Sequence, residues 1–217
     1  MDGIFYNKNR YAMQESRTDS GIMQAIEDRR SIRRFEQTKV PRKSVEEILK
    51  AGILAPSSKN RQPWKFIVAE GTARTEACNA MEKGLEREKT NPLLPGSAEY
   101  LQGAWQSLAI MRQAPVIIFV INMLGVPMGK TPTLEERISE ICNVQSIGAA
   151  MENMSLAAGA QSLGTLWICN TFFAWRELEK WLDAGGVLCA AMAVGYAGET
   201  PPARPRKALE EVVRWME

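Results

Sequence analysis

The chain is organised around one stretch, Asp28-Arg29-Arg30-Ser31-Ile32-Arg33-Arg34-Phe35. Four arginines, a serine and an aromatic residue fall within these eight positions, directly after a short apolar helical pattern that starts at Gly21. Guanidinium groups carry a permanent charge and a fork of donors that suits phosphate and carboxylate oxygens. A plain helix end is the alternative, because basic residues in a last turn complement the negative end of the helix dipole. The octapeptide alone leaves both interpretations open.

Length and composition predict a single soluble domain. The chain has 217 residues, of which 45% are hydrophobic and 24% charged, and a chain of this size can bury one sizeable core. We expect a domain at residues 21–217, preceded by an arm at residues 1–20. The net charge of +2 is too mild to indicate nucleic acid or membrane as a partner. The longest apolar run, residues 116–121, is far shorter than the ~20 residues that span a bilayer.

Cysteine and histidine usage narrows the chemistry. The four cysteines are widely spaced, with no C-x-x-C pair, so we expect reduced thiols and no metal site. Residues 1–20 lack the apolar core of a signal peptide, and a cytoplasmic protein is therefore expected. The chain contains no histidine, which excludes Ser-His-Asp and Cys-His catalysis. An enzyme built on this sequence would take its reactive group from a cofactor.

Helical and strand patterns interleave along the chain, which predicts an α/β or α+β fold with helices on both faces of one sheet. Ser44 and Glu47 have the spacing of a capping box, and Thr133 or Thr131 is placed to cap a later helix. The segments at 90–96 and 125–133 are expected to be flexible loops near a ligand. Helices are expected at 21–30, 44–55, 72–89, 98–112, 134–160 and 174–183, and strands at 65–70, 116–121, 165–168 and 187–196.

Two further motifs bear on function. Residues 55–64 read Ala-Pro-Ser-Ser-Lys-Asn-Arg-Gln-Pro-Trp, and residues 204–207 read Arg-Pro-Arg-Lys. The first is also what an ordinary helix-to-strand connection contains, with Trp64 expected in the core, and the second is also typical of a solvated basic tail. Each motif by itself is weak evidence.

In this order and spacing the three motifs resemble the FMN-dependent nitroreductase family, over about residues 22–214. The resemblance implies an α+β sandwich whose central, mostly antiparallel sheet has helices on both faces. It implies FMN as cofactor and NAD(P)H as electron donor, with no catalytic side chain because the flavin carries the chemistry. By position, the implied cofactor-binding residues are Arg29, Arg30, Ser31, Arg33, Pro56, Ser57, Ser58, Asn60, Gln62, Ile168, Cys169, Asn170, Arg204 and Arg206.

The resemblance also implies roles for these positions. Arg29, Ser31 and Arg206 match positions that bind the phosphate or ribityl chain, and Arg204 is a weaker candidate. Arg33 matches the cation near flavin N1. The residues around Cys169 match a segment that presents backbone N–H groups to flavin N5 and O4. The Cys169 thiol could lie near the ring, but we expect it to be buried and inert.

In this family the 56–62 loop reaches the flavin of the other subunit, so a homodimer with FMN at its interface is implied. We expect the small-residue helix at 146–160 to be buried in that interface. The expected reaction is NAD(P)H-dependent reduction of a nitroaromatic, quinone or related small-molecule acceptor by a ping-pong mechanism. Alternatives are reductive dehalogenation or another flavin reaction, a non-catalytic FMN-binding redox sensor, and a protein that binds another phosphate ligand.

Overall fold

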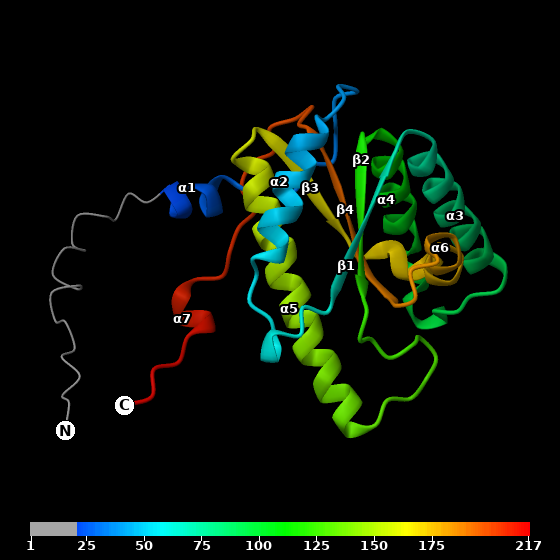
Figure 1. Cartoon of the computed structure of the whole chain (residues 1–217). Helices are drawn as coiled ribbons and strands as arrows, with labels where there is room; N and C mark the ends of the chain where they lie inside the picture. Colours follow the sequence, from blue (N-terminus) through cyan, green and yellow to red (C-terminus); the bar gives the residue numbers. More distant parts are fainter. Residues whose placement is uncertain (1–20) are drawn as a thin grey trace, which may run out of the picture.

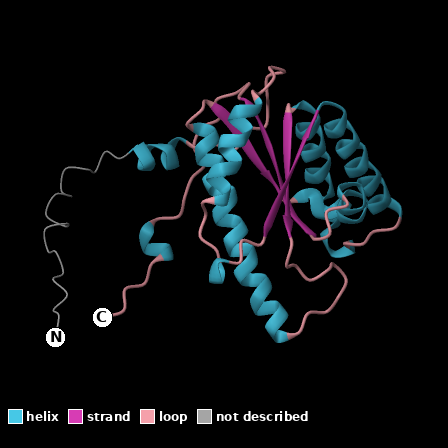
Figure 2. Ribbon diagram, in the orientation of Figure 1, coloured by secondary structure: helices cyan, strands magenta, loops and turns pink. Residues whose placement is uncertain are grey.

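The computed structural model describes residues 21–217, so the arm expected at residues 1–20 lies outside the described part. Four strands form one sheet in the order β1-β2-β4-β3, and each neighbouring pair is antiparallel. The strands are β1 (Trp64–Glu70), β2 (Val116–Asn122), β3 (Leu163–Ile168) and β4 (Val187–Tyr196). Helices lie on both faces of this sheet (Figures 1 and 2). The predicted α+β class with an antiparallel sheet is confirmed.

Strand β2 is buried along its whole length and divides the interior into two cores. Its side chains alternate between them: one core receives Ile117, Phe119 and Ile121, and the other receives Val116, Ile118 and Val120. A strand covered on both faces needs a continuous apolar sequence. This is why residues 116–121 could be recognised as a strand from the sequence.

The first core lies beneath α3 (Gly71–Thr90), α4 (Leu101–Gln113) and α6 (Trp175–Leu182). The second lies beneath α2 (Arg42–Ile53) and α5 (Leu134–Gly159). The remaining short elements are α1 (Gly21–Asp28), α7 (Leu209–Val212) and the 3₁₀ turns η2 (Ser58–Asn60), η3 (Pro95–Tyr100) and η4 (Asn170–Ala174). Among residues 21–217, no helix combines the length and the apolar character needed to cross a membrane.

One of the two predicted helix caps is confirmed and the other is wrong. Thr133 caps α5, because its Oγ1 accepts the Glu136 N–H at 3.2 Å while the Glu136 carboxylate accepts the Thr133 N–H at 2.9 Å. Ser44 does not begin α2, which starts two residues earlier after Pro41. Pro41 is the N-cap residue, and its carbonyl accepts the Ser44 N–H at 2.9 Å, so Ser44 already lies within the first turn of the helix.

The segment at 90–96, expected to be a flexible loop, is held by Glu88. This buried carboxylate accepts the backbone N–H groups of Leu93 and Leu94, at 2.9 to 3.2 Å, and pairs with Arg87. Burial opposes ionisation of Glu88, but the Leu93 N–H and the Arg87 guanidinium outweigh it and hold its pKa below the usual value. The chain then turns into η3, so part of the expected loop is ordered structure.

Figure 1 shows α1 and α7 on one side of the molecule, and several apolar side chains of these helices and of α5 are exposed. Helix α1 buries no residue, although its sequence has an apolar face. On α5 the exposed apolar residues follow helical spacing: Leu134, Ile138, Ile141 and Val144. Beyond α7, Trp215 and Met216 are 80% and 78% exposed. The surface on this side therefore has the apolar character of a contact face.

Candidate functional site

The arginine stretch is extended and lies along the edge of the sheet. Helix α1 ends at Asp28 rather than at the expected Arg30. The next residues run beside β3: Ser31 bridges Thr165 in the parallel sense, and the Ile32 N–H donates to the Thr165 carbonyl at 2.9 Å. The sheet, and not a helix terminus, therefore fixes the direction of this stretch.

Arg30 alone takes up the role of a basic residue at a helix end. Its Nη1 donates to the carbonyl of Glu27, in the last turn of α1, and to that of Arg29 at 3.0 Å. The helix-end interpretation of the octapeptide therefore applies to Arg30.

The chain after β4 brings the second basic motif to the same place. The Glu36 N–H donates to Tyr196 O at 3.0 Å, and the Gly198 N–H donates to Arg34 O at 2.9 Å. These bonds hold segment 33–36 against segment 196–199, and residues 201–206 continue from there. A cavity of about 590 Å³ results, which we call the arginine cavity. Six of the predicted cofactor-binding residues line it: Arg29, Arg30, Ser31, Arg33, Arg204 and Arg206.

The arginine cavity carries an excess of positive charge, because five arginines and one carboxylate residue, Glu27, line it. In the described part of the chain, no salt bridge joins Arg33, Arg204 or Arg206 to a carboxylate. Arg29 is paired with Glu152 of α5, but through its Nε at 3.2 Å. Both terminal nitrogens of Arg29 are thus left for a bidentate anion. Several arginines around one cavity favour a ligand with more than one negative charge.

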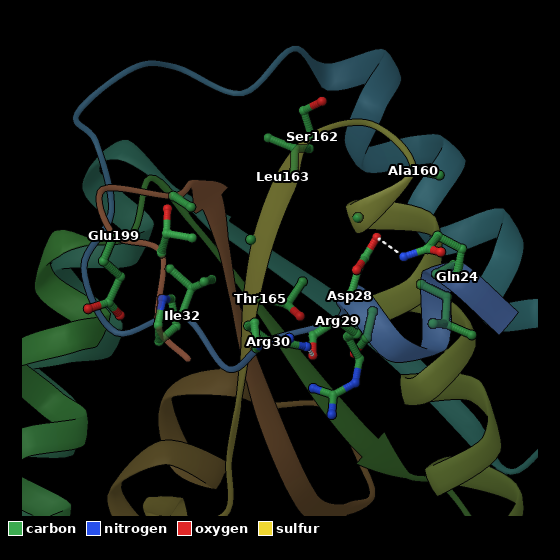
Figure 3. A pocket seen from close by; sticks show the side chains of 18 of the residues that line it. Gln24, Asp28, Arg29, Arg30, Ile32, Ala160, Ser162, Leu163, Thr165 and Glu199 are labelled. Carbon is green, nitrogen blue, oxygen red and sulfur yellow. Dashed lines mark hydrogen bonds between the residues drawn. The ribbon is translucent and has the colours of Figure 1, made fainter. Parts of the chain in front are cut away.

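A second cavity, of about 500 Å³, lies on the other side of Arg29 between α1, the end of α5 and β3 (Figure 3). Gln24 and Asp28 hydrogen-bond to each other at 2.9 Å on one wall. Much of the remaining wall is small or apolar, and includes Gly159 and Leu163. Arg29 and Arg30 line both cavities. We therefore expect a ligand bound in one cavity to change the binding affinity of the other.

The 56–62 loop does not reach either cavity within one subunit. Three of its residues have left-handed backbones: Lys59, Asn60 and Gln62, with φ of 54°, 52° and 48°. Ser57 Oγ accepts the Gln62 N–H at 3.0 Å, and the Ser58 N–H donates to Ser146 Oγ on α5 at 3.2 Å. Strained backbones persist where surrounding contacts hold them, and they concentrate at functional sites.

The loop lines neither cavity of its own subunit, so the subunit does not bring the predicted loop residues to the arginines. These residues are Pro56, Ser57, Ser58, Asn60 and Gln62.

The predicted residues after β3 also lie outside both cavities. Ile168 is buried in the first core, and Asn170 donates to Ser107 Oγ at 2.9 Å. Cys169 is exposed, not buried as expected, because the chain leaves the sheet there and enters η4. Partial burial of the thiol itself raises its pKa, which agrees with an inert group. Trp64, expected in the core, is indeed buried there.

The open edge of β3 offers a backbone donor. β3 is the last strand of the sheet, and its Thr165 carbonyl points outward to Ile32. Alternate residues of an antiparallel strand direct their N–H and C=O groups to the same side, so those of Trp167 point outward as well. Outside the sheet ladder, no described backbone group accepts a bond from the Trp167 N–H.

Sequence reasoning missed three residues that shape the site. Glu152 orients Arg29, Glu199 binds the Arg33 and Arg34 N–H groups, and Gly164 packs against Ile32. Trp167, in contrast, belongs to the segment for which backbone donors were predicted. A lone glutamate or glycine carries no local pattern that would mark it. Their roles arise from contacts between segments far apart in the chain.

Gly164 yields the first prediction. A Cβ at this position would lie 2.6 Å from Ile32 Cγ1, so Gly164→Ala must displace the segment that carries the arginines. We expect a loss of about 1–3 kcal/mol in the free energy of unfolding and weaker binding of FMN. Chemical denaturation and FMN titration measure the two effects. Gly96→Ala is the control, because nothing lies within 4 Å of its Cβ; equal behaviour of the two variants would contradict this packing.

Comparison with known proteins places this geometry in context. The family model described as the nitroreductase family matches residues 26–196. YdjA of Escherichia coli K12, a candidate NAD(P)H nitroreductase, is 30% identical over 170 residues, which cover 73% of this chain and 84% of YdjA. The iodotyrosine deiodinase of Thermotoga neapolitana is 26% identical over 194 residues, covering 86% and 93% of the two chains.

A solved structure is also similar. It is a candidate nitroreductase from Desulfovibrio desulfuricans in complex with FMN. Its sequence is 28% identical to this chain, with a TM-score of 0.63 over 90% of this chain and 96% of that one.

Proposed function

The chain belongs to the nitroreductase family of flavin oxidoreductases, and on this basis we propose that it binds FMN and uses NAD(P)H to reduce a small conjugated acceptor such as a nitroaromatic or a quinone. The observation that carries the proposal is the convergence of two distant basic motifs on one cavity. The FMN complex of the Desulfovibrio relative and the NAD(P)H in the name of YdjA support the cofactor and the donor.

The residues present fit an FMN phosphate. Arg29, Arg206 and the Ser31 hydroxyl would hold the phosphate and the ribityl chain, and Arg204 would add charge at the rim. Arg33, whose side chain has no carboxylate partner in the described residues, would face the flavin edge that becomes anionic on reduction. The Trp167 N–H would meet the ring from the open edge of β3. Bound FMN would supply the two-electron chemistry between donor and acceptor.

We further propose that the active species is a homodimer. In one subunit the 56–62 loop lies on α5 at Ser146, whereas the arginine cavity lies near Glu152. A second copy would supply the loop to the cavity, and the exposed apolar residues of α1, α5 and α7 offer a face for it. Residues such as Ile147 and Met154 of the 146–160 segment, which was predicted for the interface, are buried in their own subunit, so only the half-exposed face of that segment could take part in it. The exposed stripe lies nearer the start of α5.

Steady-state kinetics test the proposed reaction. In the proposed reaction, donor and acceptor would use one flavin face in turn. Initial-rate plots at several NAD(P)H concentrations should therefore give parallel lines. A redox sensor or FMN store would instead be reduced once, without turnover on added acceptor. Intersecting lines, with both substrates shown to bind together, would contradict a shared site.

Reductive dehalogenation is the second candidate, and the similarity to iodotyrosine deiodinase supports it. The same assay separates the two. Halide release from iodotyrosine, with one donor consumed for each halide, would assign the dehalogenase reaction. Turnover of nitroaromatics and quinones without halide release would favour the first candidate.

A further inference from the structure

Glu199 joins the two segments that build the arginine cavity. It follows β4, on the strand-exit segment that leads to Arg204 and Arg206. One carboxylate oxygen accepts the backbone N–H of Arg33 and, at 3.1 Å, that of Arg34, while the other accepts Arg34 Nε at 3.3 Å. Figure 3 shows Glu199 near Ile32, on the side of the second cavity opposite the Gln24–Asp28 pair.

These bonds are strong enough to fix local structure. Hydrogen bonds from backbone N–H groups to an ionised carboxylate are about twice as strong as neutral ones. The Glu199 side chain is 18% exposed, although the bonds that it accepts lie at the protein surface. The backbone N–H of Arg33 lowers the pKa of Glu199 most, and the N–H groups of Arg34 add to this effect. Together they outweigh partial burial, which raises the pKa, so the pKa lies below its usual value. The carboxylate is therefore charged at neutral pH.

The Arg33 side chain depends on this support. Its guanidinium donates to the Ser31 carbonyl at 3.1 Å, two residues earlier in the same segment. No described carboxylate holds it from the far side of the cavity. The direction of the Arg33 side chain is thus set by its backbone, and Glu199 binds that backbone.

We propose that Glu199 is a positioning residue, which aims Arg33 into the arginine cavity by holding the N–H groups of Arg33 and Arg34. The proposal rests on the proposed function, in which Arg33 faces the flavin. A side chain that acts this way needs the reach to place one oxygen between both N–H groups more than it needs charge. If Glu199 acted through its charge alone, a shorter side chain with a carboxylate would serve equally well at this position.

Two conservative variants separate reach from charge. Glu199→Asp keeps the charge but shortens the side chain by one methylene, so it cannot make the same bonds. Glu199→Gln keeps the reach, and its amide oxygen can still accept both N–H groups. Arg34→Ala is the matched control, because it removes the outer contact of Glu199 while leaving the N–H groups in place.

The measurement is the midpoint potential of FMN bound to each purified variant, together with the dissociation constant of FMN. For Glu199→Asp we expect the equilibrium to move away from reduced flavin by about tenfold, which is about 30 mV for a two-electron couple. Glu199→Gln and Arg34→Ala should stay within about twofold, or about 10 mV, of the wild-type protein. Glu199→Asp combined with Arg33→Ala should shift no further than Arg33→Ala alone, since both changes remove one interaction.

Several results would overturn the proposal. Three results for the midpoint potential would each show that Glu199 does not act through Arg33. They are an unshifted potential in Glu199→Asp, a larger shift in Glu199→Gln than in Glu199→Asp, and additive shifts in the double variant. A wild-type protein that binds no FMN would contradict the proposed function, and this inference with it. If the wild-type protein binds FMN but Glu199→Asp leaves the midpoint potential unchanged, this inference is contradicted while the proposed function stands.

Discussion

Arg206→Ala is expected to weaken FMN binding by about 10- to 100-fold and to leave the midpoint potential nearly unchanged, because a charge-assisted hydrogen bond is worth about 1.5–3 kcal/mol. The phosphate keeps its charge when the ring is reduced, so an arginine on the phosphate stabilises both redox states equally. Arg33→Ala should do the reverse. An arginine near flavin N1 favours the reduced form, and its loss should lower the potential by roughly 30–60 mV.

Redox titration of both variants with excess FMN measures this difference, and Lys207→Ala is the control. Lys207 is the last residue of the motif but does not line the arginine cavity, so its loss removes one positive charge without a predicted contact. If Arg206→Ala moves the potential while Arg33→Ala does not, the two roles are assigned to the wrong residues.

Mixed dimers should regain activity that neither parent has. One parent carries Arg206→Ala, which breaks the cavity. The other carries Asn60→Gly and Gln62→Gly, which remove two loop side chains while glycine accepts the left-handed backbone at both positions. If the loop acts on the other subunit, each heterodimer contains one intact site. Random reassociation should then restore about a quarter of the wild-type activity.

A loop that served its own subunit would give no recovery, because each site would then contain one defect. Lys59→Gly is the matched control for backbone change, since Lys59 is also left-handed but has no predicted contact with the cofactor. Light scattering on the same samples follows the subunit exchange. A stable, FMN-loaded and active monomer would contradict the shared site outright.

Features that depend on local pattern could be predicted from the sequence. The apolar run of β2 and the Thr133 capping box each depend only on residues that lie close together in the sequence, and both are confirmed. That Arg33 and Arg206 lie around one site could be predicted for another reason, because the order and spacing of the motifs resemble a known family. No periodicity links positions so far apart.

Features that depend on contacts between distant segments were not predictable. Ser44 has the right spacing for a cap, but Pro41 is the N-cap residue of α2 instead. Cys169 was expected to be buried, yet the chain turns out of the sheet there. Glu152 and Glu199 become part of the site because α5 and the segment after β4 fold back onto the arginine stretch. Such roles are visible in a structure alone.

The central claim is that the arginine cavity holds the phosphate of FMN, and paired titrations with FMN and riboflavin test it most directly. The two ligands share the ring and the ribityl chain, so the phosphate accounts for any difference in affinity. We predict that the wild-type protein binds FMN at least about tenfold more tightly than riboflavin, and that Arg29→Ala and Arg206→Ala each reduce that ratio. Equal affinity of the wild-type protein for FMN and riboflavin would contradict the account.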